Sequence, residues 1–125
     1  LMKLHKAKTE AKAEVDIWGS GNARREFMLA EDLANIILEC VDKFEKLPNL
    51  TNVGLGHDHS INDYYERAAK VIGFKGKFVH DLSKPEGMKQ KLVCTERMES
   101  LGLKAKYSLE EGIAKAYAYY LNTIK

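Results

Sequence analysis

The sequence predicts an α+β domain in which helices accompany a small sheet. The segments with helical periodicity are mixed with short extended segments, and the regular strand–helix alternation of a doubly wound parallel sheet is missing. The chain has 125 residues, of which 45% are hydrophobic. This length and apolar content fit one domain, residues 1–125, with a modest core.

The first two helices follow from composition and periodicity. Residues 1–13 are rich in Lys, Leu and Ala and contain no helix breaker, which predicts a helix. From Glu31 onward, apolar residues at helical spacing predict one apolar stripe on a helix that ends near the sequence KLPN. The stripe consists of Leu33, Ile36, Ile37, Cys40, Val41 and Phe44.

Short strands are predicted between the helices. Val15 and Ile17 precede a Gly-Ser-Gly-Asn turn and Phe27 and Leu29 follow it, which predicts the two arms of a hairpin-like loop. The segments LTNVGLG and GKFVHD are predicted to be further strands. The charged segment LSKPEGMKQK is predicted to be a loop, because a Pro and a Gly interrupt it.

Capping signals locate the later helices. Ser60 and Ser108 are each followed three residues later by an acidic residue, which is the spacing of a capping box. The first of these helices is predicted to end at Gly73, and the second to carry an apolar face toward the end of the sequence. Thr95 is predicted to cap a short helix between them.

Composition narrows the classes of partner. The formal net charge is only +2, so no binding to nucleic acid or to a membrane surface is predicted. No apolar run approaches the roughly 20 residues of a membrane span, and no secretory leader opens the sequence. Cys40 and Cys94 lie far apart without a CxxC pattern, as is typical of a reducing compartment, so we expect a cytoplasmic protein.

The segment IWGSGNARREF combines a Trp, a glycine turn and two arginines. Guanidinium groups bind phosphate oxygens in a bidentate manner and an indole offers a flat apolar wall, so Trp18, Arg24 and Arg25 are typical of a site for a phosphorylated ligand. In the alternative interpretation, Trp18 belongs to the core and the arginines to a solvated turn. Both interpretations fit the spacing.

No metal ligand or catalytic residue is predicted in this chain. The segment GHDHS offers His57, Asp58 and His59, but a metal site needs further ligands at suitable spacing, and His80 with Asp81 is the only other candidate. The segment NVGLG is an incomplete phosphate loop. The sequence also contains no YxxxK pair, GxSxG elbow or HExxH motif.

Several motifs, in order and spacing, resemble the C-terminal half of the GDP-L-fucose synthase family. These are NADP-dependent epimerase-reductases of the extended short-chain dehydrogenase/reductase group. The resemblance covers nearly all of the chain, and its most specific parts are WGSGxxxREF, NVGxGxDxSI and SKPxGxxxK. The matching segments are LHKAK, VDIWGSGNARREF, EDLAN, NVGLGHDHSI, VIGFKGKFVHDLSKPEGMKQKL and SLEEGIAKAYAYYL.

The resemblance implies that this chain is the substrate-binding domain of a longer enzyme. In the family, a Rossmann domain carries the NADP site and the catalytic residues; it would lie upstream of Leu1, so the chain alone is expected to be inactive. The implied reaction is 3,5-epimerisation and 4-keto reduction of GDP-4-keto-6-deoxy-D-mannose or a related keto-heptose. The full-length enzyme is expected to be a homodimer, because the family is commonly dimeric.

The resemblance also implies which residues contact the GDP-sugar. Trp18 and Arg25 come from the WGSG and REF motifs, and Lys3 takes the place of a usual Arg. Glu86 replaces the Asp of the family's SKPDG loop. Cations from separate segments suit a ligand with two negative phosphates. The predicted substrate-binding residues are Lys3, Trp18, Arg25, Lys77, Glu86 and Lys91.

The chain departs from the family pattern near this loop. Cys94 replaces an acidic residue, and EGMKQ lacks a Pro and an Arg that the family has. These changes leave the sugar open, with a deoxyheptose as one possibility. Two alternative functions also stay open: a domain of another nucleotide-sugar epimerase or dehydratase, and a non-catalytic nucleotide-sugar binding module.

Overall fold

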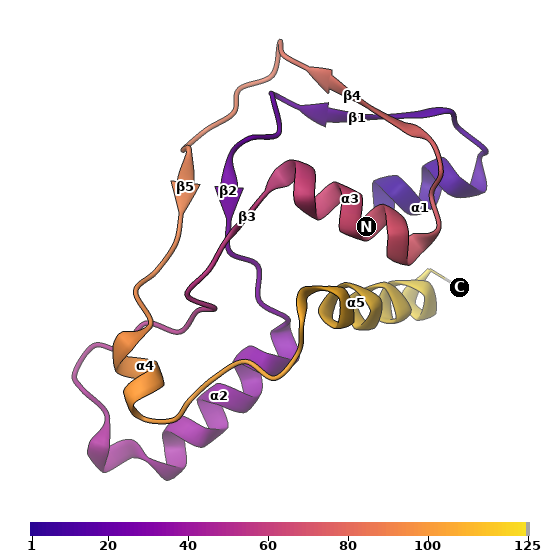
Figure 1. Cartoon of the computed structure of the whole chain (residues 1–125). Helices are drawn as coiled ribbons and strands as arrows, with labels where there is room; N and C mark the ends of the chain where they lie inside the picture. The colour runs from indigo at the N-terminus through magenta and orange to yellow at the C-terminus, as the bar shows by residue number, and fades with distance from the viewer. Residues whose placement is uncertain (125) are drawn as a thin grey trace.

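The computed structural model describes residues 1–124 and confirms the predicted α+β class (Figure 1). Helices and strands alternate irregularly along the chain. In order, the elements are α1 (Met2–Thr9), β1 (Glu14–Trp18), β2 (Arg24–Arg25), α2 (Ala30–Asp42), the 3-10 helix η1 (Phe44–Lys46), β3 (His59–Ser60), α3 (Ile61–Ile72), β4 (Lys77–Asp81), β5 (Gln90–Lys91), α4 (Glu96–Ser100) and α5 (Leu109–Thr123).

The strands form two small sheets. β1 and β4 run parallel and side by side, with Glu14 level with Lys77 and Trp18 level with Asp81 (Figure 1). In the second sheet, β2 lies between β3, which is antiparallel to it, and β5, which is parallel to it. Residues far apart in sequence therefore meet at the two ends of the turn that joins β1 to β2.

The predicted hairpin around this turn is wrong. β1 pairs with β4 and not with the segment after the turn, and β2 consists of two residues only. Val15 and Ile17 are buried, as their alternation predicts, in a strand whose burial pattern alternates throughout. Alternation identifies the buried face of a strand but not its neighbour, which explains the error.

The segment LTNVGLG is not a strand either. The backbone N–H groups of Leu55 and Gly56 donate to the carboxylate of Glu26 and not to a neighbouring strand. Glu26 also accepts a hydrogen bond from the backbone N–H of Val93 at 3.2 Å. One carboxylate thus takes the place of a strand partner for this segment.

Both predicted capping boxes are confirmed. The Ser60 hydroxyl accepts from the backbone N–H of Asp63, whose carboxylate accepts from the backbone N–H of Ser60. The same reciprocal pair opens α5 at Ser108. Gly73 ends α3 in the left-handed conformation, with φ 79°. Thr95 precedes the short helix α4 but makes no cap hydrogen bond.

The buried apolar residues other than Ile17 form two separate clusters. The larger cluster joins α1, β1 and α3, and consists of Leu4, Ala7, Val15, Ala68, Ala69, Ile72 and Phe74. The smaller cluster joins α2 and α4 at the other end of the fold through Ile36, Met98 and Leu103 (Figure 1). None of the helices in residues 1–124 has the length and apolar character needed to cross a membrane.

We expect Leu103→Ala to lower the free energy of unfolding by about 2–5 kcal/mol, because Leu103 is 0% exposed and its loss leaves a cavity against Ile36 and Met98. Urea denaturation of the two proteins measures this difference. Leu82→Ala is the matched control, since Leu82 is 74% exposed and its removal should change stability by no more than about 0.5 kcal/mol. Equal losses in both variants would contradict the assignment of the smaller core.

Candidate functional site

The turn after β1 is built on two glycines in the left-handed conformation. Gly19 has φ +70° and Gly21 has φ +72°. A Cβ atom at Gly19 would lie 2.6 Å from the Cγ atom of Glu86, and one at Gly21 would lie 2.0 Å from the Oδ1 atom of Asn62. The glycines therefore supply both the backbone conformation and the close approach of two other segments.

Two side chains hold this turn from opposite sides. The backbone N–H of Ser20 donates to Glu86 Oε1 at 2.5 Å, and Asn62 Nδ2 donates to the carbonyl of Ser20 at 3.1 Å. Hydrogen bonding by Ser20 lowers the pKa of the Glu86 carboxyl below its usual value, so this group is ionised at neutral pH. Asn62 in turn contacts Nε2 of His80 at 2.8 Å.

A cavity of about 430 Å³ lies beside the turn, and we call it the turn cavity. Four of the six predicted substrate-binding residues line it, although they come from three distant segments. Apolar and small residues complete its walls, among them Ile17, Ile61 and Tyr65. The four predicted residues are Lys3, Trp18, Arg25 and Glu86.

Trp18 is not a core residue. Its side chain is 63% exposed and lines the turn cavity, and the ammonium of Lys84 lies 5.8 Å from the centre of its ring. This distance is typical of a cation–π contact. The interpretation of Trp18 as a core residue is therefore wrong, and the indole offers an accessible flat surface.

The two cations that line the cavity, Lys3 and Arg25, differ in their partners. The ammonium of Lys3 lies 2.6 Å from Oδ2 of Asp16 and donates to the Asp16 carbonyl at 2.5 Å. This contact with Lys3 lowers the pKa of the Asp16 carboxyl. Arg25 instead donates through Nη1 to the carbonyls of Arg24 and Met88, at 2.7 and 2.8 Å. Neither acceptor is a carboxylate, so Arg25 keeps its full positive charge for a ligand.

A nearly buried carboxylate, Asp58, ties the strands around Arg25 together. Its Oδ1 accepts from Nε of Arg24 at 2.6 Å, and its Oδ2 accepts from Nε2 of Gln90 at 2.6 Å. Arg24 Nη2 also donates to the Asp58 carbonyl at 2.8 Å. Asp58 is 8% exposed, and the hydrogen bond from Gln90, followed by that from Arg24, lowers the pKa of its carboxyl. We call these three residues the Asp58 clip.

The Asp58 clip was not predicted. The sequence offers Asp58 only as a possible metal ligand, and within residues 1–124 no group of three or more His, Cys, Asp or Glu side chains could hold a metal ion. Arg24 was considered with Arg25 for phosphate binding, but its guanidinium is occupied by Asp58. Sequence gives little sign of such a contact, because the partners are 34 and 32 residues apart.

Two predicted residues lie outside the lining of the turn cavity. Lys91 is exposed on β5, level with Arg25 in the parallel pairing of β2 and β5, so the two cations are neighbours. Lys77 begins β4 and is level with Glu14, whereas Trp18 is level with Asp81. Four residues of strand separate the two levels, which corresponds to about 13 Å.

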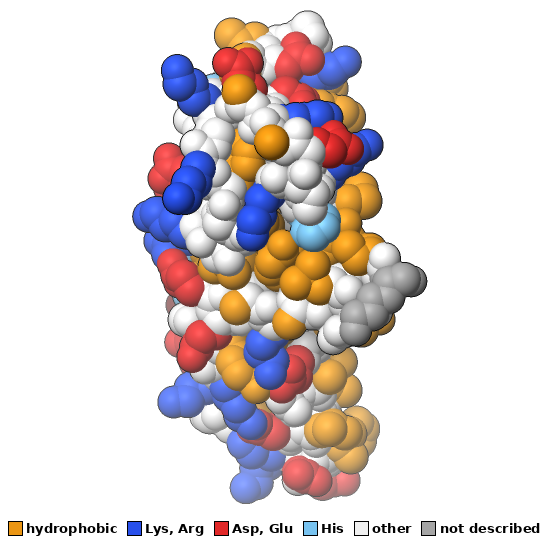
Figure 2. Space-filling model, turned by 90° about the vertical axis from the view of Figure 1, so that its right-hand side faces the viewer, with side chains coloured by type: hydrophobic (Ala, Val, Ile, Leu, Met, Phe, Trp, Pro, Cys, Tyr) orange, Lys and Arg blue, Asp and Glu red, His pale blue; other side chains and the backbone are white. Residues whose placement is uncertain are grey.

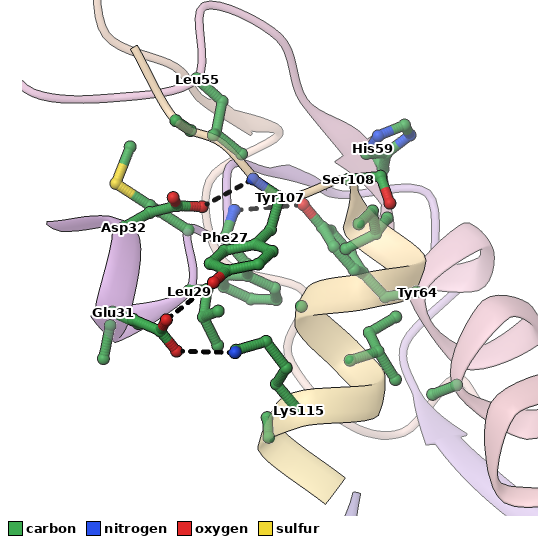
Figure 3. A pocket seen from close by; sticks show the side chains of 18 of the residues that line it. Phe27, Leu29, Glu31, Asp32, Leu55, His59, Tyr64, Tyr107, Ser108 and Lys115 are labelled. Atoms are coloured by element: carbon green, nitrogen blue, oxygen red, sulfur yellow. Dashed lines mark hydrogen bonds and ion pairs between the residues drawn. The ribbon is translucent and has the colours of Figure 1, made fainter. Parts of the chain in front are cut away.

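A larger cavity of about 1220 Å³ lies between α2, α3 and α5, and we call it the helix cavity (Figure 3). Several of its polar groups are paired with one another. The hydroxyl of Tyr107 donates to Glu31 at 2.7 Å, and the ammonium of Lys115 lies 3.0 Å from the same carboxylate. Asp32 accepts from the backbone N–H groups of Lys106 and Tyr107. The walls are mostly apolar, with Phe27 and Leu29 among the side chains drawn in Figure 3.

Comparison with known proteins shows to which class of enzymes the fold is similar. A family model described as the NAD dependent epimerase/dehydratase family matches residues 1–54. In fold, the chain matches a GDP-mannoheptose C4 reductase from Campylobacter jejuni with NADP bound, with a TM-score of 0.84, 31% identity and coverage of 96% of this chain and 42% of that chain. Part of a GDP-L-fucose synthetase from Naegleria fowleri bound to NADP has the same fold, with a TM-score of 0.85 at 20% identity over 98% of this chain and 39% of that chain. The described residues thus share the fold of about 40% of these extended short-chain dehydrogenase/reductases.

Curated relatives narrow this class. GDP-L-colitose synthase from Yersinia pseudotuberculosis is 48% identical over 122 residues, which are 98% of this chain and 40% of that relative. GDP-L-fucose synthase from Azorhizobium caulinodans is 45% identical over 119 residues, which are 95% of this chain and 38% of that relative. The chain is thus a homologue of part of the GDP-L-fucose synthases, and the resemblance predicted from the motifs is confirmed. It spans about 40% of the length of these relatives.

We expect Asp58→Asn to destabilise the fold in a pH-dependent manner. The pKa of Asp58 is lower in the folded protein than its ordinary value of 3.8, so its carboxylate stabilises the fold above that pH. This contribution is lost as the pH falls from about 4 through the lower folded pKa. Urea denaturation from pH 7 to pH 3 should therefore show the wild type and Asp58→Asn converging in stability at the acid end.

Asp42→Asn, at an exposed position at the end of α2, controls for the removal of one carboxylate. A stability difference between wild type and Asp58→Asn that stays constant over the whole pH range would contradict the role of the Asp58 carboxylate.

Proposed function

We propose that this chain is the substrate-binding domain of an NADP-dependent epimerase-reductase. Its substrate is a GDP-4-keto-6-deoxy-sugar, either GDP-4-keto-6-deoxy-D-mannose or a related keto-heptose. The observation that carries the proposal is the convergence of Lys3, Trp18, Arg25 and Glu86 on the turn cavity. The names of the relatives, which include GDP-L-fucose and GDP-L-colitose synthases and a GDP-mannoheptose reductase, support it.

The charges around the cavity suit a diphosphate. Arg25 donates only through Nη1 within the described residues, so Nε and Nη2 are available for two phosphate oxygens. Lys91 lies beside it in register and provides a second cation. Lys3 is already paired with Asp16, so in this proposal it adjusts its contacts around the ligand and adds little net attraction.

The remaining two groups suit the sugar. The indole of Trp18 offers a flat apolar surface against which a sugar ring can lie. Glu86 uses Oε1 for the turn and retains Oε2 as an acceptor for a hydroxyl group. In the proposed reaction these residues orient the substrate, and orientation lowers the barrier for chemistry performed by other groups.

The glycine-containing segment of this chain does not fit the phosphates of NADP. The segment NVGLG has the glycines of a phosphate loop, but the N–H groups of Leu55 and Gly56 are bound to the Glu26 carboxylate, which would also repel an anion. We therefore infer that NADP and the acid–base residues belong to the part of the protein that corresponds to the remaining length of the relatives. We further propose that the complete protein is a cytoplasmic homodimer.

We expect Arg25→Ala to weaken the binding of GDP-L-fucose to the complete protein by roughly 1.5–3 kcal/mol, or about 10- to 150-fold in Kd, the range for hydrogen bonds to charged groups. Isothermal titration calorimetry measures this loss. Lys77→Ala is the control. It removes a positive charge at the end of β4 that is farther from Trp18, and it should leave Kd unchanged. An unchanged Kd for Arg25→Ala, or equal losses in both variants, would contradict the proposed site.

We also expect the complete protein to bind GDP-L-fucose at least 10-fold more tightly than UDP-glucose. Calorimetry measures both dissociation constants. A preference for UDP-glucose would favour another nucleotide-sugar epimerase of the same group.

We expect the 125-residue chain alone to oxidise no NADPH in the presence of a GDP-keto-sugar. Absorbance at about 340 nm measures the amount of NADPH. NADPH consumption by the chain alone would show that the catalytic residues lie within it.

A further inference from the structure

Tyr64, on helix α3, bridges two backbone groups on either side of Glu26. Its hydroxyl donates to the carbonyl of Arg25 at 2.9 Å and accepts from the backbone N–H of Phe27 at 3.1 Å. Figure 3 shows the side chain of Tyr64 directed from α3 toward Phe27. In a strand, the carbonyl of one residue and the N–H two residues later lie on the same edge. One phenol can serve both groups, because it is a donor and an acceptor at once.

These two hydrogen bonds act where the sheet ends. β2 consists of Arg24 and Arg25 only, and it is paired with β3 on one side and with β5 on the other. Asp58 holds the side chain of Arg24. Tyr64 binds the next backbone groups along the chain, at Arg25 and Phe27. Its hydroxyl therefore fixes the course of the chain directly after the last paired residue.

The ring of Tyr64 is itself held by its neighbours. Its centre lies 4.6 Å from that of the Phe27 ring and 5.7 Å from that of the His59 ring, which meets it edge to face. Burial raises the pKa of the Tyr64 hydroxyl above its usual value, so the group is protonated at neutral pH and can donate. The ring contacts do not need the oxygen. Tyr64→Phe thus removes the two hydrogen bonds and leaves the packing in place.

The placement of Arg25 decides how well a phosphate can use its charge. The formal net charge is only +2, and basic and acidic side chains are interspersed over the face seen in Figure 2. A weak overall field leaves the binding of phosphates to single cations in fixed positions. Ordering a side chain as long as Arg during binding costs affinity. The carbonyls of Arg24 and Met88 hold the guanidinium of Arg25, and Tyr64 holds its backbone.

We propose that Tyr64 is a positioning residue for Arg25. By fixing the backbone at the Arg25 carbonyl, its hydroxyl keeps the guanidinium at the turn cavity before a diphosphate binds, and so reduces the free energy lost on ordering the side chain. The identity of the ligand as a GDP-sugar rests on the proposed function, whereas the hydrogen bonds of Tyr64 do not. A purely structural role of the hydroxyl would lower stability without changing affinity through Arg25.

Hydrogen–deuterium exchange of the complete protein, without ligand, tests the hydrogen bonds. In Tyr64→Phe, the backbone N–H of Phe27 should exchange about 5-fold faster or more than in the wild type, because it loses its acceptor. The N–H of Gly73, which donates to the Ala69 carbonyl at the end of α3, is the internal reference. Its exchange should change by less than about 2-fold. Unchanged exchange at Phe27, or equal acceleration at both positions, would overturn the proposal.

A double-mutant cycle tests whether Tyr64 acts through Arg25. We expect Tyr64→Phe to raise the Kd of the complete protein for GDP-L-fucose by about 2- to 12-fold, the range for a typical hydrogen bond. In an Arg25→Ala background the same substitution should leave Kd unchanged, because no guanidinium remains to be positioned. Tyr107→Phe, which removes a hydroxyl bound to Glu31, is the matched control and should leave Kd unchanged. No loss from Tyr64→Phe, or equal losses in both backgrounds, would contradict a positioning role.

Steady-state kinetics with GDP-4-keto-6-deoxy-D-mannose and NADPH separate positioning from a loss of folded enzyme. Tyr64→Phe should raise KM by about the same factor and leave kcat unchanged, because phosphate contacts are equal in the ground state and the transition state. A lower kcat at unchanged KM would count against the proposal, since a smaller folded fraction gives that result.

The proposed function and the role of Tyr64 can fail separately. A wild-type protein that binds no GDP-L-fucose would contradict the proposed function. The same cycle with inorganic pyrophosphate as the probe then tests Tyr64 alone. Coupling between Tyr64→Phe and Arg25→Ala would support the positioning role, and additive or absent effects would refute it.

Discussion

The Asp58 carboxylate holds together three segments that would otherwise have little reason to meet. β2, β3 and β5 contain two residues each, and so few backbone hydrogen bonds do not stabilise a sheet. Hydrogen bonds to a charged group that is shielded from water contribute more, about 1.5–3 kcal/mol each. With Arg24 on one oxygen and Gln90 on the other, Asp58 makes the contact between β2 and β5 selective for one register.

That register decides the charge pattern of the candidate site. Arg24 is level with Gln90, and Arg25 is level with Lys91. Because neighbouring residues of a strand point to opposite sides, the residues of the clip alternate with Arg25 and Lys91 of the candidate site. The guanidinium of Arg24 is paired with the Asp58 carboxylate, whereas that of Arg25 donates to backbone carbonyls. One carboxylate thereby assigns different roles to two adjacent arginines.

The parts of the fold that local chemistry determines could be predicted, and the parts that depend on distant contacts could not. The capping boxes at Ser60 and Ser108 and the helix end at Gly73 need only neighbouring residues. The hairpin was predicted wrongly because alternation in β1 contains no information about its partner β4. In the site, the motifs identified four residues that share the turn cavity, whereas the clip partners of Asp58 carry no local signal.

The stripe predicted on α2 shows where such a prediction reaches its physical limit. Its members lie on one continuous side of α2, but only Ile36 and Cys40 pack into the smaller core cluster, whereas Ile37 and Val41 are more than half exposed. Periodicity predicts which side of a helix is apolar, but it does not predict which other segment packs against that side. The smaller core cluster takes up only Ile36 and Cys40 from this stripe, so helical spacing alone could not distinguish its buried residues from its exposed ones.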